Sequence, residues 1–119
     1  MRILFALILL CSSTCGAYAD PRPYSCNLNA MTSTERSRHA ELARALWRSV
    51  LERKELPDGY AFRVPETSLV PTVEWVALER KCCPFFAFTI TQAEDQGAVW
   101  LRITGDKGVK AFIAAELEL

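Results

Sequence analysis

Apolar side chains recur with the period of a helix in the first half of the chain. The stripe comprises Ala43, Leu46, Trp47, Val50 and Leu51. Such spacing is typical of a helix that buries one face. The preceding pattern Thr32-x-x-Glu35 predicts a helix that begins at Thr32, because the hydroxyl and the carboxylate can each pair with a free backbone N–H there. The turn residues Pro57-Asp58-Gly59 are expected to end this segment.

A strand and a second helix are expected next. Apolar residues alternate with others from Tyr60 to Val64, as in a short half-buried strand. A helix is predicted from Pro71 to Cys82, because proline is favoured in a first helical turn. Pro84 disfavours helical geometry at the residue before it. The second helix should therefore end at or just before Cys83.

The last third of the chain predicts a hairpin followed by a closing helix. Apolar residues alternate from Phe86 to Ile90 and again from Val99 to Ile103. The polar link from Gln92 to Gly97 is short, which favours an antiparallel hairpin. Asp106 is the expected N-cap of the final helix, which presents one apolar face between Val109 and Leu117.

The predicted order of elements is helix, strand, helix, strand, strand, helix. The simplest fold that buries every apolar stripe is of the α+β class, with a three-stranded sheet and helices packed on one face. The strand at 60–64 reaches the hairpin through a helix. It is therefore expected to run parallel to one of the two hairpin strands, through a right-handed crossover.

Composition and charge narrow the class of protein. The 119 residues include 14 basic and 14 acidic side chains, and half of the residues are apolar. Such a length suits one domain with one core. A near-neutral chain without a basic stripe argues against a nucleic-acid partner, because phosphates favour clustered lysine and arginine.

The N-terminal residues have the pattern of an export signal. Arg2 precedes an apolar run from Ile3 to Leu10, and Ala17-Tyr18-Ala19 forms a small-x-small cleavage site. The run is too short for a membrane-spanning helix. The sequence therefore predicts a signal peptide over residues 1–19, a flexible lead-in over 20–30 and a single α+β domain over 31–119, exported to the periplasm or secreted.

Cleavage after Ala19 would leave three cysteines, Cys26, Cys82 and Cys83. An odd number of cysteines in an exported protein means that at least one is free, paired between chains or bound to a metal. Thiolates are soft ligands, and three of them suit a soft metal ion or metalloid. One hypothesis is therefore a non-enzymatic binding module with Cys26, Cys82 and Cys83 as ligands and His39 as a candidate fourth.

The alternative hypothesis gives the cysteines a structural role. A disulfide from Cys26 to either Cys82 or Cys83 would attach the lead-in to the domain, as small exported domains often require. Function would then lie on a protein-interaction surface. Trp100, Phe85 and Ala87 are out of phase with the core-facing residues and are expected to form an apolar patch on the open sheet face, which favours a homodimer or another partner.

Other polar residues carry weaker signals. His39 lies one turn before Ala43 along the apolar stripe, and a packed or hydrogen-bonded histidine is the simplest interpretation. Glu74 and Glu79 are five residues apart and do not share a helix face, so both are expected to be solvated. The chain has no nucleophile elbow, zinc-protease motif or phosphate-binding loop, and a non-enzymatic role is favoured.

The segment Glu79-Arg80-Lys81-Cys82-Cys83-Pro84-Phe85-Phe86 leads into the predicted hairpin and the final helix. It resembles a small bacterial family with a Glu-Arg-x-Cys-Cys-Pro-Phe-Phe signature, and the likeness extends over roughly the last 45 residues. The resemblance implies a bacterial exported domain and implies no catalytic role.

Overall fold

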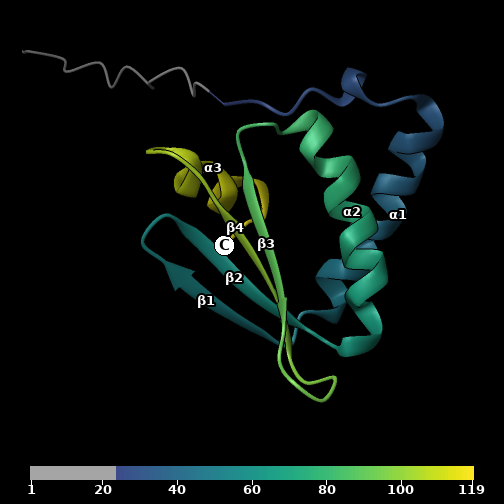
Figure 1. Cartoon of the computed structure of the whole chain (residues 1–119). Helices are drawn as coiled ribbons and strands as arrows, with labels where there is room; N and C mark the ends of the chain where they lie inside the picture. The colour runs from purple at the N-terminus through teal and green to yellow at the C-terminus, as the bar shows by residue number, and fades with distance from the viewer. Residues whose placement is uncertain (1–23) are drawn as a thin grey trace, which may run out of the picture.

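A computed structural model describes residues 24–119 as three helices and a four-stranded antiparallel sheet, in the order α-β-β-α-β-β-α. Figure 1 shows the arrangement, with α1 and α2 side by side and the sheet next to them. The α+β class is confirmed. The elements are α1 (Ser33–Ser49), β1 (Glu52–Leu56), β2 (Gly59–Val64), α2 (Leu69–Cys82), β3 (Ala87–Gln92), β4 (Val99–Thr104) and α3 (Val109–Glu116), with short 3-10 turns η1 (Leu28–Ala30) and η2 (Glu66–Ser68).

The sheet has the strand order β1-β2-β4-β3, and every neighbouring pair is antiparallel. The predicted β3–β4 hairpin is confirmed. Both β2 and β3 run antiparallel to β4, so they run parallel to each other, and α2 connects them. The expectation that the strand at 60–64 shares the direction of one hairpin strand is therefore correct, with β4 inserted between the two.

The strand β1 was not predicted, so the three-stranded sheet was wrong. We expected the helix to continue toward Pro57, but α1 ends at Ser49 and the chain returns as the edge strand β1. Four of its five residues are exposed, so it lacks the alternation by which a half-buried strand is recognised. Leu51, expected on the apolar stripe of the helix, is 56% exposed.

One face of the sheet carries the core, and residues from all three helices contribute to it. The buried cluster comprises Leu42, Leu46, Phe62, Val64, Trp75, Val99, Leu101, Ile103, Val109 and Ile113. Its strand members share one face, because Phe62 pairs with Leu101 and Tyr60 pairs with Ile103 in the β2–β4 register. Packing of the helices on one face is therefore confirmed.

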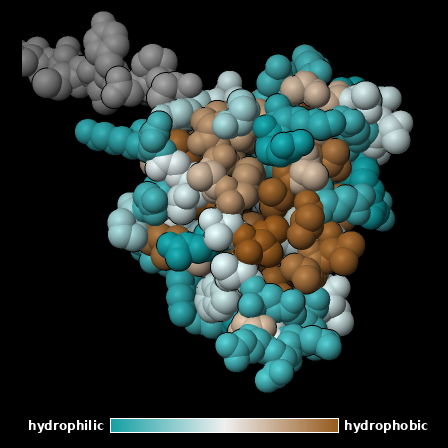
Figure 2. Space-filling view, viewed as in Figure 1, coloured by the Kyte–Doolittle hydropathy of each residue, from teal (hydrophilic) through white to brown (hydrophobic). Residues whose placement is uncertain are grey.

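Trp100 and Ala87 lie on the opposite face of the sheet, as expected, and Ala87 is exposed. The expected apolar patch of three residues was wrong, because Phe85 does not belong to it. Lys54 places its ammonium 4.6 Å from the ring centroid of Trp100. Phe85 precedes β3 and packs against the core, with its ring centroid 5.2 Å from that of Phe112. Exposed apolar surface is found elsewhere: Figure 2 shows hydrophobic side chains over α2 and β3, where Val70 and Val73 are exposed.

The first helix begins as the sequence predicts. Thr32 accepts a hydrogen bond from the Glu35 backbone N–H at 3.1 Å, and the Glu35 carboxylate accepts one from the Thr32 N–H at 3.3 Å. The third helix begins differently, because Asp106 is not its N-cap. Gly108 occupies that position with a φ of +95°, a left-handed conformation that favours glycine.

The predicted export signal, Met1 to Ala19, lies outside the residues that the structure describes. Within residues 24–119, no helix combines the length and the apolar character that crossing a membrane requires.

Replacing Thr32 with alanine is expected to lower the free energy of unfolding by about 1 kcal/mol, because the capping hydrogen bond to the helix start is lost. Urea denaturation followed by circular dichroism measures the change. Thr34→Ala, in the first turn of the same helix, is the matched control and should shift the free energy by less than about 0.5 kcal/mol. Equal effects of the two substitutions would contradict the capping role.

Candidate metal centre

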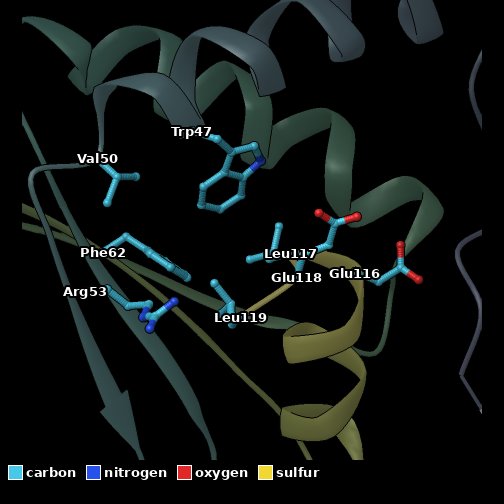
Figure 3. A pocket seen from close by; sticks show the side chains of 8 residues that line it. All are labelled: Trp47, Val50, Arg53, Phe62, Glu116, Leu117, Glu118 and Leu119. Atoms are coloured by element: carbon cyan, nitrogen blue, oxygen red, sulfur yellow. The ribbon is translucent and has the colours of Figure 1, made fainter.

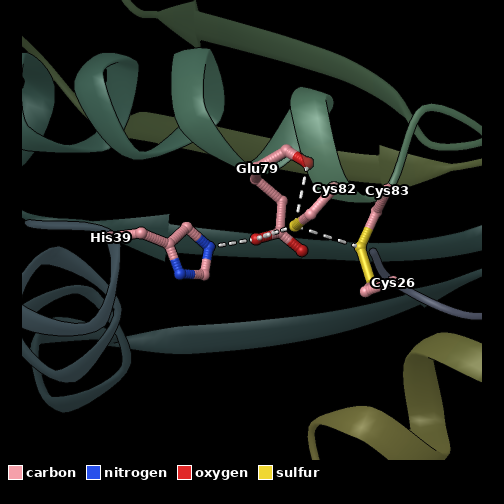
Figure 4. Close-up of polar contacts among 5 residues, drawn as sticks. All are labelled: Cys26, His39, Glu79, Cys82 and Cys83. Carbon is pink, nitrogen blue, oxygen red and sulfur yellow. Dashed lines mark hydrogen bonds and ion pairs between the residues drawn. A yellow bond between two sulfur atoms is a disulfide. The ribbon is translucent and has the colours of Figure 1, made fainter. Parts of the chain in front are cut away.

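Four potential ligand atoms converge where α2 ends. They belong to Cys26, Glu79, Cys82 and Cys83, and all lie within 4.8 Å of one another. Glu79, Cys82 and Cys83 are buried and Cys26 is half-buried. Figure 4 shows that α2 and the residue after it supply three of these side chains and that Cys26 comes from the segment before α1. The structure thus brings together all three cysteines predicted as ligands.

The end of α2 explains why two adjacent cysteines lie close together. Successive residues of a helix project about 100° apart, which would separate the two thiols. Cys83 leaves the helix, with φ −123° and ψ 67°, because Pro84 disfavours helical geometry at the residue before it. Its sulfur lies 3.7 Å from the sulfur of Cys82.

Cys26 and Cys83 form a disulfide, with Cα atoms 4.8 Å apart. This is one of the two pairings that the sequence allowed. Backbone and aromatic contacts hold the same segment in place: the Asn27 N–H donates to the Cys82 carbonyl at 2.8 Å, and the rings of Tyr24 and Phe85 lie 4.8 Å apart. Residues 24–30 therefore pack against the domain at the cysteine cluster.

Cys82 is the cysteine outside the disulfide among residues 24–119, and it is buried. Its thiol donates to the Glu79 carbonyl at 3.4 Å and lies 3.8 Å from the Glu79 carboxylate. Burial, and then the negative charge of Glu79, raise the pKa of the Cys82 thiol to about 11. At neutral pH the group is therefore a protonated thiol and a poor nucleophile.

Glu79 was expected to be solvated, and that expectation was wrong. The residue is 8% exposed, and its carboxylate pairs with the His39 imidazole across the α1–α2 interface. His39 is hydrogen-bonded, as predicted, and it also stacks on Trp75. His39 contacts the Glu79 carboxylate but does not belong to the group of converging ligand atoms. The fourth candidate ligand is therefore Glu79, not His39 as predicted.

The spacing of apolar residues on α2 is the signal that could have identified Glu79 as a buried residue of the site. Trp75, Glu79 and Cys82 lie four and three residues apart, which places them on one helix face. That face is buried. A carboxylate on a buried face requires a polar partner. The single histidine of the chain, on the stripe of the neighbouring helix, was a candidate for that partner.

Exposed charged pairs on both sides of His39 and Glu79 connect the same two helices. Arg38 donates two hydrogen bonds to Glu74, at 2.8 and 2.7 Å, and lowers the pKa of that carboxyl. Lys81 donates to Glu35 at 2.8 Å. Together these contacts align the end of α2 against the start of α1, and this alignment positions the Glu79 carboxylate.

Apolar side chains surround the sulfur atoms. Met31, 2% exposed, forms a small buried cluster with Cys82 and Cys83. Leu78, Phe85 and Phe86 pack against it. In the reduced protein these surroundings would allow three thiols and a carboxylate to bind an ion largely shielded from water. In the oxidised protein the disulfide removes two of the four ligands.

One cavity adjoins this centre, and a second, larger one adjoins the first. The smaller, about 150 Å³, has Cys26 and Glu79 in its wall. The larger, about 460 Å³, is the hollow shown in Figure 3, between the end of α1 and the residues after α3. Trp47, Glu116 and Leu117 line both cavities, so they stand between the outer hollow and the space beside the cysteines.

Comparison with known proteins finds no matching family model and no similar curated protein or solved structure.

The Cys82 thiol is expected to react slowly with iodoacetamide in the folded protein at pH 8. With a pKa of about 11, roughly one thiol in a thousand is a thiolate at that pH, and the rate should rise about tenfold per pH unit up to pH 10. Intact mass spectrometry measures the labelling. Denatured, unreduced protein should take up one label on residues 24–119, and three labels there would contradict the disulfide.

The variant Glu79→Gln tests the origin of this slow reaction. It removes the negative charge that raises the Cys82 pKa, so labelling at pH 8 should be faster than in the unmodified protein. Glu74→Gln, an exposed position on the same helix, is the matched control and should leave the rate unchanged. Equal rates for the two variants would mean that burial alone sets the reactivity of Cys82.

Reduction of the Cys26–Cys83 disulfide is expected to lower the free energy of unfolding by roughly 4 kcal/mol. The bond closes a loop with a sequence separation of 57, and a loop of that length restricts the unfolded chain by about this amount. Chemical denaturation with and without reductant measures the difference. Cys82→Ser retains the disulfide and should respond to reductant as the unmodified protein does. Coincident unfolding curves would contradict a structural contribution.

Proposed function

We propose that the chain is an exported, non-enzymatic binding module that captures a soft metal ion or metalloid through Cys26, Cys82 and Cys83 when its disulfide is reduced. The observation that carries the proposal is the convergence of four ligand atoms within 4.8 Å. Thiolate sulfur is the donor that soft ions such as Cu(I) prefer, and it also suits zinc.

Glu79 supports the proposal as a fourth donor. Its carboxylate lies beside the Cys82 sulfur and is held by His39. A ligand held in this way by a neighbouring side chain is pre-oriented for metal binding. Three sulfurs and one oxygen can complete a four-coordinate site, and the three sulfurs alone suit a trigonal metalloid.

The same segment carries the resemblance to the bacterial family with the Glu-Arg-x-Cys-Cys-Pro-Phe-Phe signature. Within it, Glu79, Cys82 and Cys83 supply three of the four ligand atoms, and Phe85 and Phe86 pack against the sulfurs. We propose that the signature is a metal-binding segment and that membership of this family explains its presence here.

A second candidate function follows from the oxidised state. The Cys26–Cys83 disulfide and the buried Cys82 thiol also suit an interaction domain whose cysteines are structural. Its partner surface would not be the predicted Trp100 patch. Val70 and Val73 on α2 offer exposed apolar side chains, and a homodimer through this helix is the corresponding proposal.

Titration of the reduced protein with Cd²⁺ is expected to show one tight site with thiolate-to-metal absorbance, and the oxidised protein should show none. Cys26→Ser, Cys82→Ser and Cys83→Ser should each weaken binding by at least about tenfold, because each removes a soft ligand.

Ser25→Ala, next to Cys26, serves as the control and should bind as the unmodified protein does. Unchanged affinity in Cys82→Ser and Cys83→Ser would contradict the metal-binding function and leave the structural one. A dimer in light scattering that dissociates in Val73→Asp would support that second function.

A further inference from the structure

An apolar cavity adjoins the cysteine cluster. Its volume is about 150 Å³, and Cys26 and Glu79 belong both to its wall and to the converging set of ligand atoms. Aromatic and aliphatic side chains form most of the remaining wall, among them Trp47, Trp75 and Ile113. An ion bound by the thiolates would therefore lie next to a space that favours an apolar group.

The polar residues of this wall do not call for a polar ligand. Glu79 and His39 pair with each other, so neither needs a guest as its partner. Glu116, the third charged or titratable side chain of this wall besides the cysteine, is exposed to solvent. A bare ion would use the sulfurs and leave the apolar space unfilled. A cavity of roughly 150 Å³ lined by apolar side chains accepts a guest the size of benzene.

We propose that the ligand of this centre is a soft metal or metalloid that carries one small organic group, with the metal on the thiolates and the organic group in the cavity. This inference rests on the proposed function and adds the class of ligand. The ligand is thus an organometal or organometalloid compound.

The outer hollow supplies a way in for such a ligand. It opens at the end of α1 and shares Trp47, Glu116 and Leu117 with the cavity beside the cysteines. Glu116 is exposed, and the other two carry the apolar surface. Both side chains are half-buried, and Figure 3 shows them facing each other across the hollow. The lining of the hollow also includes Arg53, Glu116 and Glu118. The apolar side chains of Trp47 and Leu117 continue from it to the cavity beside Cys26, which is half-buried.

Phenylarsine oxide is a suitable probe, because it carries both the metalloid that binds thiols and an organic group that can enter the cavity. It reacts with two thiols, forms two As–S bonds and releases its oxygen with the two thiol protons as one water molecule. Arsenic remains trivalent and keeps its bond to the ring. Cys26 is the thiol that lies in the cavity wall, so an arsenic atom bonded to it can hold the ring inside the cavity.

A series of organic groups on the same arsenic chemistry tests the cavity in the unmodified, reduced protein. Methyl, phenyl and naphthyl arsenicals each form two As–S bonds, both with the protein and with dithiothreitol. In competition against dithiothreitol the free energy of these bonds therefore cancels, and differences in affinity report the contribution of the organic group. The phenyl compound should bind at least about tenfold more tightly than the methyl compound, because the ring leaves water. The naphthyl compound should lose this advantage, because it exceeds the cavity.

Ala43→Leu fills the cavity from α1, where Ala43 forms part of the wall. It should abolish the advantage of phenyl over methyl and retain the binding of inorganic arsenite. Ala45→Leu, exposed on the same helix, is the matched control and should keep the advantage. Circular dichroism establishes that both variants fold, and the series in the unmodified protein does not depend on them.

The outcomes separate this inference from the function on which it rests. If arsenite and Cd²⁺ bind but phenyl has no advantage over methyl, or Ala43→Leu retains that advantage, the organic group is not bound in the cavity and only the inference is overturned. If no arsenical and no Cd²⁺ binds to the reduced protein, both are overturned. A phenyl advantage that Ala43→Leu removes and Ala45→Leu keeps supports the inference.

Discussion

The break in the helix before Pro84 is the constraint on which the rest of this structure depends. A proline in that position keeps Cys83 out of helical geometry, and the last helical residue is therefore Cys82. The turn brings two adjacent sulfurs to 3.7 Å and directs the chain into β3. A helix continued by one turn would separate the thiols and misplace the strand that follows, so fold and site share one local cause.

The buried pair of Glu79 and His39 links this helix end to α1. Burying a carboxylate is unfavourable unless it is paired, and the histidine supplies the partner from the neighbouring helix. Burial, and then the charge of this carboxylate, raise the pKa of the nearby Cys82 thiol and keep it protonated. The Cys82 thiol would thus stay protonated until a metal replaces the proton, and binding would release that proton.

The disulfide and the proposed metal site exclude each other, because Cys26 and Cys83 cannot be both disulfide and thiolate. Oxidation holds residues 24–30 against the domain through a covalent bond, whereas a bound metal would hold the same segment through coordination. Either state keeps Cys26 beside the end of α2. Compartment redox would therefore decide which one is populated.

The sequence by itself determined those features that depend on neighbouring residues: the cap at Thr32, the helix end at Cys82, the β3–β4 hairpin and the α+β class. It also singled out the three cysteines, because their number was odd. Contacts between distant segments required the tertiary structure. The exposed strand β1 is held by backbone pairing with β2 rather than by an apolar pattern. The choice of Cys83 for the disulfide and the burial of Glu79 against His39 depend on how α1, α2 and residues 24–30 pack together, and spacing along the chain does not encode that packing.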